Sequence, residues 1–209
     1  MGVWKISESV DELLSMIDFK GEDYATFEKF KVKSRQAHWL SYRLMIRQLM
    51  GPDCKCDFYY DEHGKLQFKD LDYSISVTHS GLYSGVIISK DHYVGIDIEK
   101  IGDRINLLAD KFLTEKEKEF LPKEDQYRYL TVLWSAKEAL YKLFGKSNVI
   151  FDKNIILEPF ILSNQGKFQG HIIIDDIKRS YDLGYEFSDE EDYILVYCVD
   201  ESIRIKEKI

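Results

Sequence analysis

Two carboxylates lie two positions apart in an otherwise apolar stretch, Val-Gly-Ile-Asp-Ile-Glu-Lys at residues 94–100. Successive side chains of a strand point to opposite faces, so Asp97 and Glu99 would share one face with Gly95, and the apolar side chains would share the other. Two anions this close repel one another unless a cation lies between them. The stretch therefore predicts a strand with a metal-binding face. The alternative is an edge strand whose polar face meets solvent.

A third carboxylate occurs in the helical pattern over residues 127–144, where Glu138 and Lys142 are four positions apart and share one face. Such a pair commonly does no more than stabilise a helix. In the alternative reading, Glu138 joins Asp97 and Glu99 at one metal ion, and the lysine neutralises a phosphate. Three carboxylates with water and phosphate oxygens suit Mg2+, which prefers octahedral oxygen coordination.

Strands are expected to carry the first two carboxylates and the residues before them. The segment 73–79 alternates loosely and ends in a polar cluster that includes His79. Strands over 83–89 and 93–99 are separated by a short turn, so we expect them to pair as a hairpin. If 73–79 joins the same sheet, His79 lies near the carboxylates.

The first half of the chain begins with helical patterns. Ser9 and Glu12 form the signature of a capping box at the start of a helix over 9–17. A longer helical pattern runs over 24–50 and ends at Gly51. Short strands are expected on both sides of a turn, over 57–60 and 65–68.

The second half repeats the order of helices followed by strands, which indicates an α+β protein of two halves. A helical pattern covers 106–121, with Thr114 as its cap and Glu117 within a run of Lys and Glu that we expect to face solvent. After the helix over 127–144, strands are expected over 154–162, 170–174, 181–187 and 193–199.

The composition limits the possible partners. With 29 basic and 37 acidic side chains the net charge is −8, which argues against a nucleic-acid binder. No stretch approaches the ~18 apolar residues of a membrane span, and the first residues do not resemble a signal peptide. The three cysteines, an odd number, suggest reduced thiols. We therefore expect a cytoplasmic protein without a membrane partner.

Together, these motifs resemble a known family. Residues 94–100, followed about forty positions later by Trp-Ser-Ala-Lys-Glu-Ala-Leu-Tyr-Lys at 134–142, are similar to the paired signature of the 4'-phosphopantetheinyl transferases. Ser-Val-Thr-His-Ser-Gly at 76–81 resembles a further motif of the surfactin-synthetase-activating type. Gly64-Lys65 resembles its Gly-Lys-Pro element, with leucine in place of proline. The match spans roughly residues 30–150.

The resemblance implies the fold of the long, monomeric type, in which two similar α+β halves are related by a pseudo-two-fold axis. The halves would be residues 1–100 and 101–209, with the active site at their interface. The implied activity is transfer of the 4'-phosphopantetheine group from coenzyme A to a serine of an apo acyl or peptidyl carrier protein. The reaction depends on Mg2+, or on Mn2+, and releases 3',5'-ADP. Such enzymes serve fatty-acid, polyketide or nonribosomal peptide synthesis.

For the site, the resemblance implies that Asp97, Glu99 and Glu138 hold the metal ion together with the pyrophosphate of coenzyme A. Glu138 is also a candidate for the base that takes the serine proton. A metal-bound water is the alternative base, because a carboxylate bound to a metal is a weaker one. Lys142 would stabilise the departing 3',5'-ADP.

The remaining candidates would bind coenzyme A. His79 with Thr78 would bind its 3'-phosphate, and Lys65 would contact the nucleotide phosphates. Arg35 and Arg43, on the first long helical segment, are further candidates for phosphate contacts.

A carrier protein with an acidic recognition helix, as is typical of the family, requires a locally basic or apolar surface. We expect Lys111, Lys116 and Lys118, beside Phe112 and Leu113, to contribute to it. Two other functions are compatible with these residues. One is a metal-dependent phosphodiester or pyrophosphate hydrolase, and the other is a non-catalytic module that binds carrier proteins.

Overall fold

The computed structural model describes residues 1–17, 22–51, 56–145, 149–190 and 192–202. The described part of the first half contains three helices, a three-stranded antiparallel sheet of order β1-β5-β4 and a small hairpin of β2 and β3. The elements are β1 (Gly2–Lys5), α1 (Val10–Ser15), α2 (Glu22–Phe27), α3 (Lys33–Met50), β2 (Phe58–Tyr60), β3 (Leu66–Phe68), β4 (Ser74–Ser80) and β5 (Tyr83–Ser89).

The described part of the second half contains a five-stranded antiparallel sheet of order β6-β10-β9-β8-β7, with helices before and between its strands. The elements are β6 (Val94–Lys100), the 3-10 helix η1 (Asp103–Leu107), α4 (Ala109–Phe112), α5 (Glu115–Glu119), α6 (Gln126–Phe144), α7 (Phe151–Asn154), β7 (Ile155–Leu157), β8 (Gln165–Ile174), β9 (Ile177–Phe187) and β10 (Tyr193–Val199).

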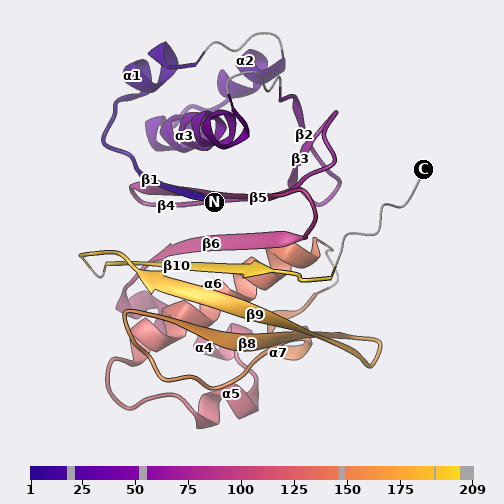
Figure 1. Cartoon of the computed structure of the whole chain (residues 1–209). Helices are drawn as coiled ribbons and strands as arrows, with labels where there is room; N and C mark the ends of the chain where they lie inside the picture. The colour runs from indigo at the N-terminus through magenta and orange to yellow at the C-terminus, as the bar shows by residue number, and fades with distance from the viewer. Residues whose placement is uncertain (18–21, 52–55, 146–148, 191, 203–209) are drawn as a thin grey trace.

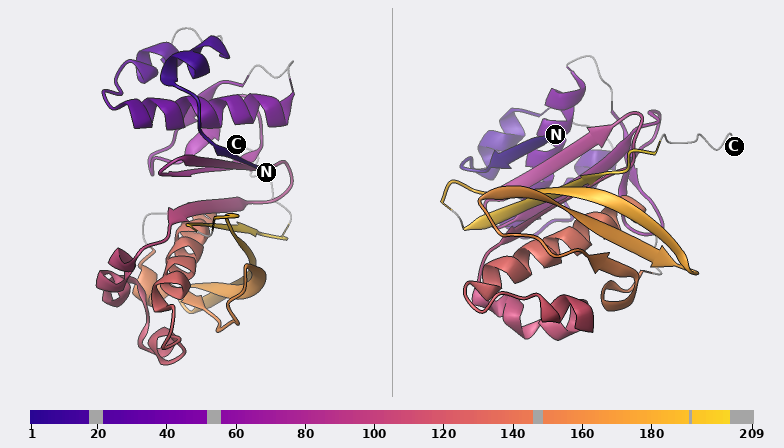
Figure 2. Two further views of the ribbon diagram at one scale, coloured as in Figure 1. Left: turned by 90° about the vertical axis from the view of Figure 1, so that its left-hand side faces the viewer. Right: turned by 60° about the horizontal axis from the view of Figure 1, so that its bottom comes forward.

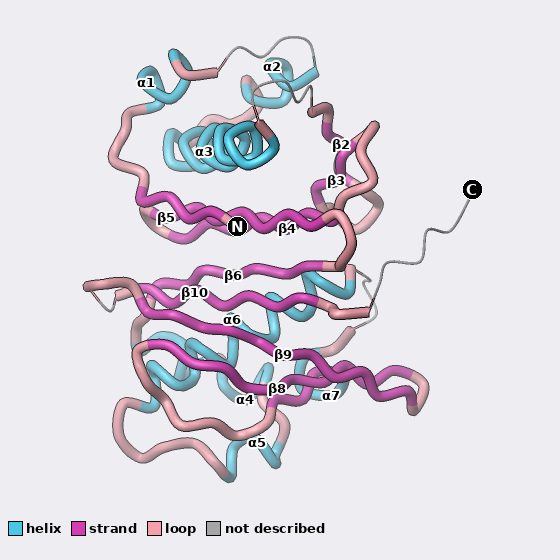
Figure 3. Tube along the Cα trace, in the orientation of Figure 1, coloured by secondary structure: helices cyan, strands magenta, loops and turns pink. Residues whose placement is uncertain are grey.

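The elements stack in layers, shown in Figures 1 and 3. Helices α1 to α3 cover the outer face of the three-stranded sheet, and β6 lies on the opposite side of that sheet. Figure 2 shows α6 packed along the five-stranded sheet. Among the described residues, two large hydrophobic cores lie around α3 and α6, and a smaller cluster of Ile87, Val94 and Ile96 lies on β5 and β6. The two edge strands β4 and β6 meet between these cores.

Local sequence signals predicted many elements correctly. The Ser9 and Glu12 side chains form the expected capping box of α1. Helix α6 ends at Gly145, which adopts a φ of 69°, a left-handed conformation that glycine reaches without strain. The α+β class is confirmed. The pseudo-two-fold relation of the halves stays a prediction.

Three expected elements are different in the structure. The pattern over 24–50 is interrupted and forms two helices, α2 and α3. The pattern over 106–121 forms the three short helices η1, α4 and α5, and Glu117, which was expected to face solvent, is fully buried. Strands β5 and β6 do not pair as a hairpin, since β5 pairs with β1 and β4 while β6 pairs with β10.

Strand β6 therefore belongs to the second sheet, although the expected division at residue 100 assigned it to the first half. That division stays a prediction. Cys198 is a free, buried thiol, but Cys56 is disulfide-bonded, so the expectation of reduced thiols is wrong for Cys56. Among the described helices, none combines the length and the apolar character that are needed to cross a membrane.

Candidate active site

Helix α6 approaches β6 very closely at Gly95. A Cβ atom added there would lie 2.0 Å from the backbone oxygen of Ala139, so only glycine fits at this position. Asp97 and Glu99 follow Gly95 on the same face of the strand, as the alternation predicted. The close approach brings Glu138 and Lys142, the neighbours of Ala139 on the helix, to the two carboxylates of the strand.

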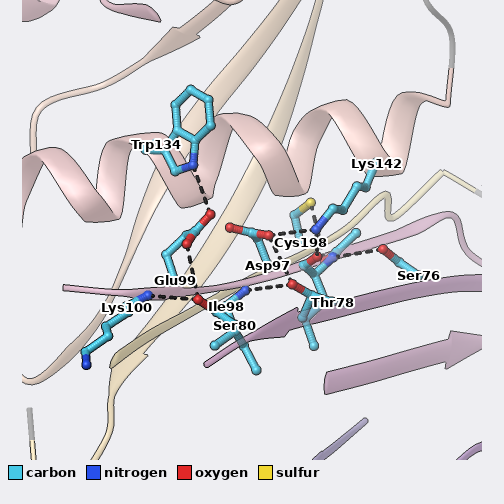
Figure 4. Close-up of polar contacts among 12 residues, drawn as sticks. Ser76, Thr78, Ser80, Asp97, Ile98, Glu99, Lys100, Trp134, Lys142 and Cys198 are labelled. Carbon is cyan, nitrogen blue, oxygen red and sulfur yellow. Dashed lines mark hydrogen bonds and ion pairs between the residues drawn. The ribbon is translucent and has the colours of Figure 1, made fainter. Parts of the chain in front are cut away.

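Asp97 is the centre of this arrangement, as Figure 4 shows. The Lys142 ammonium donates to its Oδ1 at 2.6 Å, and the Thr78 hydroxyl donates to the same oxygen at 3.1 Å. The Asp97 side chain is 5% exposed and the Lys142 side chain 27%. The second oxygen, Oδ2, is buried and accepts no hydrogen bond from the part of the chain that the structure describes. One oxygen of the carboxylate therefore has no donor among the described residues.

Glu99 lies beside Asp97 and is held by two donors. The indole Nε1 of Trp134 donates to Oε1 at 3.1 Å, and the Ser80 hydroxyl donates to Oε2 at 3.4 Å. Burial raises the pKa of the Glu99 carboxyl, and the negative charge of Asp97 adds to the effect. The Trp134 ring packs edge-on against Phe112, at 5.3 Å between centroids, which fixes the direction of its N–H group.

Glu138 has the most perturbed carboxyl of the site. Its pKa is raised to about 7, first by burial and then by the negative charge of Asp97, with a further contribution from Glu99; Lys142 opposes the shift. The charges of Asp97 and Glu99 thus act on the Glu138 carboxyl across the contact of β6 and α6. A proton acceptor with a pKa near neutrality is well suited to general-base chemistry.

A divalent cation is the group that these residues imply. With the side chains as they lie, no three His, Cys, Asp or Glu residues in the described ranges converge on one point that could hold an ion. The donor set nevertheless suits a hard cation, because it consists of carboxylates and includes the open, buried Oδ2 of Asp97. A bound cation would also remove the repulsion that raises the pKa of Glu138.

Basic groups border the carboxylates on the side of α3. The imidazole rings of His79 and His38 stack at 4.4 Å between centroids. Burial lowers the pKa of His79 to about 4, and the nearby positive charges of His38, Lys142 and Arg35 contribute. Arg35 is exposed. The Lys65 ammonium donates to the backbone oxygen of Lys142 at 2.7 Å, at the C-terminal end of α6.

Two predicted coenzyme A contacts do not fit the structure. Thr78 is 4% exposed, and its hydroxyl faces β6, whereas His79 faces α3, because neighbouring residues of a strand point to opposite faces. Arg43 is 3% exposed, forms an ion pair with Asp23 at 2.9 Å and lies 4.0 Å from the Trp39 ring. Arg43 therefore stabilises the first core and does not face the site.

The structure also reveals an ion pair that the sequence analysis missed. The ammonium of Lys137 contacts Glu117 Oε2 at 2.7 Å, and neither side chain is exposed. The same ammonium lies within 3.0 Å of the backbone oxygens of Phe112, Phe151 and Ile155. Because the Phe112 and Phe151 rings pack against Trp134, this pair supports the indole that holds Glu99. A lysine in the second turn before a helix end gives no local signal of such burial.

A cavity of about 770 Å3 opens beside Glu99 and Trp134, lined by η1 and the end of β6. The expected carrier surface lies near it but differs in detail. Phe112 and Leu113 are buried, with 0% and 2% exposure, so they are not available to a partner. Leu108, which lines the cavity, is 36% exposed, and its chain neighbour Leu107 is 81% exposed.

Comparisons with known proteins identify a family that this chain resembles in sequence. The model of a family described as the 4'-phosphopantetheinyl transferase superfamily matches residues 93–198, from β6 to β10. The 4'-phosphopantetheinyl transferase gsp of Aneurinibacillus migulanus is 32% identical over 111 residues, which cover 52% of this chain and 46% of the relative. The protein slr0495 of Synechocystis sp. (strain ATCC 27184 / PCC 6803 / Kazusa), provisionally named a 4'-phosphopantetheinyl transferase, is 28% identical over 153 residues.

That second match covers 64% of this chain and 62% of the relative, so the chain spans less than two thirds of the length of either protein. The resemblance seen in the motifs is confirmed. Because the family model covers half of the chain, including the strand and the helix that carry the three carboxylates, the chain belongs to the 4'-phosphopantetheinyl transferase superfamily.

Proposed function

We propose that this protein transfers the 4'-phosphopantetheine group of coenzyme A to a serine of an apo acyl or peptidyl carrier protein and releases 3',5'-ADP. The observation that carries the proposal is the meeting of Asp97, Glu99, Glu138 and Lys142 at the contact of β6 and α6. Family membership supports it, since the family model includes both elements.

The carboxylates of Asp97, Glu99 and Glu138 would hold Mg2+ or Mn2+. A divalent cation bound there supplies positive charge that offsets the diphosphate of coenzyme A and favours attack on its phosphorus. Glu138 would accept the proton of the acceptor serine; its pKa of about 7 describes the metal-free site, and a cation bound to it would lower that pKa. Lys142, at the partly exposed edge of the site, stabilises the charge that develops on the departing 3',5'-ADP.

His79 and Arg35 would bind the 3'-phosphate of coenzyme A, with Lys65 near the nucleotide phosphates. With its pKa lowered to about 4, His79 is neutral at physiological pH and offers one N–H donor before the phosphate arrives. The exposed Arg35 supplies the positive charge. The carrier protein would approach over the cavity beside Glu99 and Trp134, where the exposed side chain of Leu108 offers an apolar contact.

The test is incubation of the protein with coenzyme A, Mg2+ and a panel of apo carrier proteins, followed by mass spectrometry of the carriers and measurement of 3',5'-ADP. A gain equal to one phosphopantetheine group, with an equal amount of 3',5'-ADP, supports the proposal. Release of 3',5'-ADP without any carrier protein would instead indicate a hydrolase. Binding of a carrier without any mass gain would indicate a non-catalytic module.

A further inference from the structure

Four hydroxyl side chains form a regular series along β4. They occur at every second residue, so all four point to the same face, toward β6; Figure 4 shows three of them, Ser76, Thr78 and Ser80. Each accepts a hydrogen bond from a backbone N–H of β6, at 3.0 to 3.2 Å. The pairs are Ser74 with Val94, Ser76 with Ile96, Thr78 with Ile98 and Ser80 with Lys100. We call the four side chains the hydroxyl ladder.

The hydroxyl ladder accepts the hydrogen bonds that the backbone of a neighbouring strand would accept in a continuous sheet. Strand β6 is at the edge of its sheet, and among the described strands it pairs through its backbone with β10 only. The N–H groups on its other edge face β4 and would be buried without acceptors there, which is costly. The hydroxyls of β4 supply the acceptors and thereby fix β6 relative to the first half of the chain.

Two members of the ladder have a second partner. A hydroxyl can accept and donate at the same time. Thr78 accepts from the Ile98 N–H at 3.0 Å and donates to Asp97 Oδ1 at 3.1 Å. Ser80 accepts from the Lys100 N–H and donates to Glu99 at 3.4 Å. In the described ranges, Ser74 and Ser76 have the N–H contact but no carboxylate partner.

We propose that Thr78 and Ser80 are positioning residues that hold the Asp97 and Glu99 carboxylates in the orientation that binds the divalent cation. This inference rests on the proposed function. Because the Thr78 hydroxyl accepts from the Ile98 N–H, its own proton is directed at Asp97 Oδ1. The second oxygen of that carboxylate, Oδ2, has no donor among the described residues. Lys142 binds the same oxygen as Thr78, so the two donors together fix the carboxylate plane.

Within the hydroxyl ladder, Thr78 has the larger role. Its bond to Asp97 is shorter than the bond of Ser80 to Glu99, and Glu99 also has the Trp134 indole as a donor. Partners of metal ligands typically change metal affinity by about 10- to 100-fold when they are removed. We expect Thr78→Val to fall in this range and Ser80→Ala to have a smaller effect.

The test compares Thr78→Val with Ser76→Ala, a matched control from the same ladder. Each variant removes one acceptor of a β6 N–H group, but only Thr78→Val removes a donor to a carboxylate. Valine keeps the methyl group that packs near Gly85, so the shape at this position is retained. Thr78→Ser keeps the hydroxyl and serves as the rescue variant.

The first measurement is the Mn2+ dissociation constant by calorimetry, with the unfolding temperature in EDTA as the control for stability. We expect both substitutions to lower the unfolding temperature, but only Thr78→Val to weaken Mn2+ binding, by about 10-fold or more. Thr78→Ser should bind Mn2+ as the wild type does. Equal Mn2+ affinity in Thr78→Val and Ser76→Ala would overturn the proposal, and so would a wild type that binds no Mn2+.

The second measurement is transfer activity at saturating Mg2+, which separates this inference from the proposed function. If the wild type binds Mn2+ and the variants follow the expected order, but no carrier protein gains mass, the positioning role stands and the proposed function fails. If transfer occurs and Thr78→Val retains wild-type Mn2+ affinity and turnover, the proposed function stands and the positioning role fails.

Discussion

Helix α6 carries two lysines five positions apart, each paired with a carboxylate, and the two pairs have opposite characters. The Lys137 and Glu117 side chains are completely buried, and four oxygens surround the Lys137 ammonium. The Lys142 side chain is 27% exposed, and its partner Asp97 keeps one buried oxygen without a donor in the described part of the chain. The first ion pair has all its charged atoms paired within the protein, whereas in the second pair one carboxylate oxygen has no donor among the described residues.

This difference separates a structural ion pair from a reactive one. Every charge of the first pair is met within the protein, so it can tie α5, α6 and β7 together but has nothing left to bind a ligand. In the second pair, Asp97 lies near Glu99 and Glu138, and burial together with the negative charges of Asp97 and Glu99 raises the pKa of Glu138 to about 7. Several carboxylates with only one lysine to neutralise them are expected of a site that binds a cation.

The largest effect is expected for Lys137→Met, which removes the positively charged partner of the buried Glu117 and leaves it only hydrogen bonds from Thr114 and Leu157. Breaking a buried ion pair from one side typically costs about 3–5 kcal/mol of folding free energy. Urea unfolding in EDTA measures the loss, with Lys142→Met as the matched control on the same helix. A loss below about 1 kcal/mol for Lys137→Met would show that the first pair is not structural.

For Lys142→Met we expect transfer to slow by about 10²–10³-fold, as for loss of one donor that stabilises developing charge. Turnover should fall by more than coenzyme A affinity, because the leaving group gains its charge in the transition state. Stability in EDTA should fall by about 1–2 kcal/mol, less than for the buried pair because solvent screens Lys142. Mg2+ should restore the stability of this variant but not that of Lys137→Met.

Glu138→Gln should stabilise the metal-free protein at alkaline pH while it abolishes transfer. The pKa of Glu138 is about 7 in the folded state against 4.5 for an ordinary glutamate, so the folded state binds the proton more tightly. Its favourable contribution is present at pH below about 4.5 and is lost as the pH rises through 7.

With partial solvent screening, Glu138→Gln should gain about 1–2 kcal/mol relative to the wild type at pH 8, and little at pH 5. Thermal unfolding in EDTA at both pH values measures this gain. If the stability difference between Glu138→Gln and the wild type were the same at pH 5 and pH 8, the pKa of Glu138 would not be raised in the folded state.

The smallest effect is expected for Trp134→Phe, which keeps an aromatic ring beside Phe112 but removes the donor to Glu99. A hydrogen bond to a charged group at a partly buried site contributes about 1–2 kcal/mol. Mn2+ affinity should fall by about 10-fold, with little change in unfolding temperature. Unchanged affinity would show that Ser80 alone holds Glu99.

The sequence predicted those features that depend on neighbours along the chain. Alternation placed Asp97 and Glu99 on one face, and the Glu138 to Lys142 spacing placed both on one side of α6. Contacts between distant segments were not accessible in this way. Glu117 was expected in solvent because its partner Lys137 is twenty positions away, and a surrounding run of charges usually marks an exposed face.

The assignment of Thr78 failed for a reason that the sequence does contain. Thr78 and His79 are adjacent in a strand, so they cannot face the same ligand from one side of the sheet. Hydroxyl residues at 74, 76, 78 and 80 mark the face that meets β6. We expected β5 to pair with β6 as a hairpin. That pairing would use the edge of β6 that the hydroxyls of β4 contact in the structure, so the alternation in β4 was not recognised as a contact with β6.

The most direct test of the account compares the mass of an apo carrier protein after incubation with coenzyme A, Mg2+ and either the wild type or the Asp97→Asn variant. We predict that the carrier gains one phosphopantetheine group with the wild type and none with Asp97→Asn, although the variant remains folded by circular dichroism. Undiminished transfer by Asp97→Asn would contradict the central role of the open carboxylate.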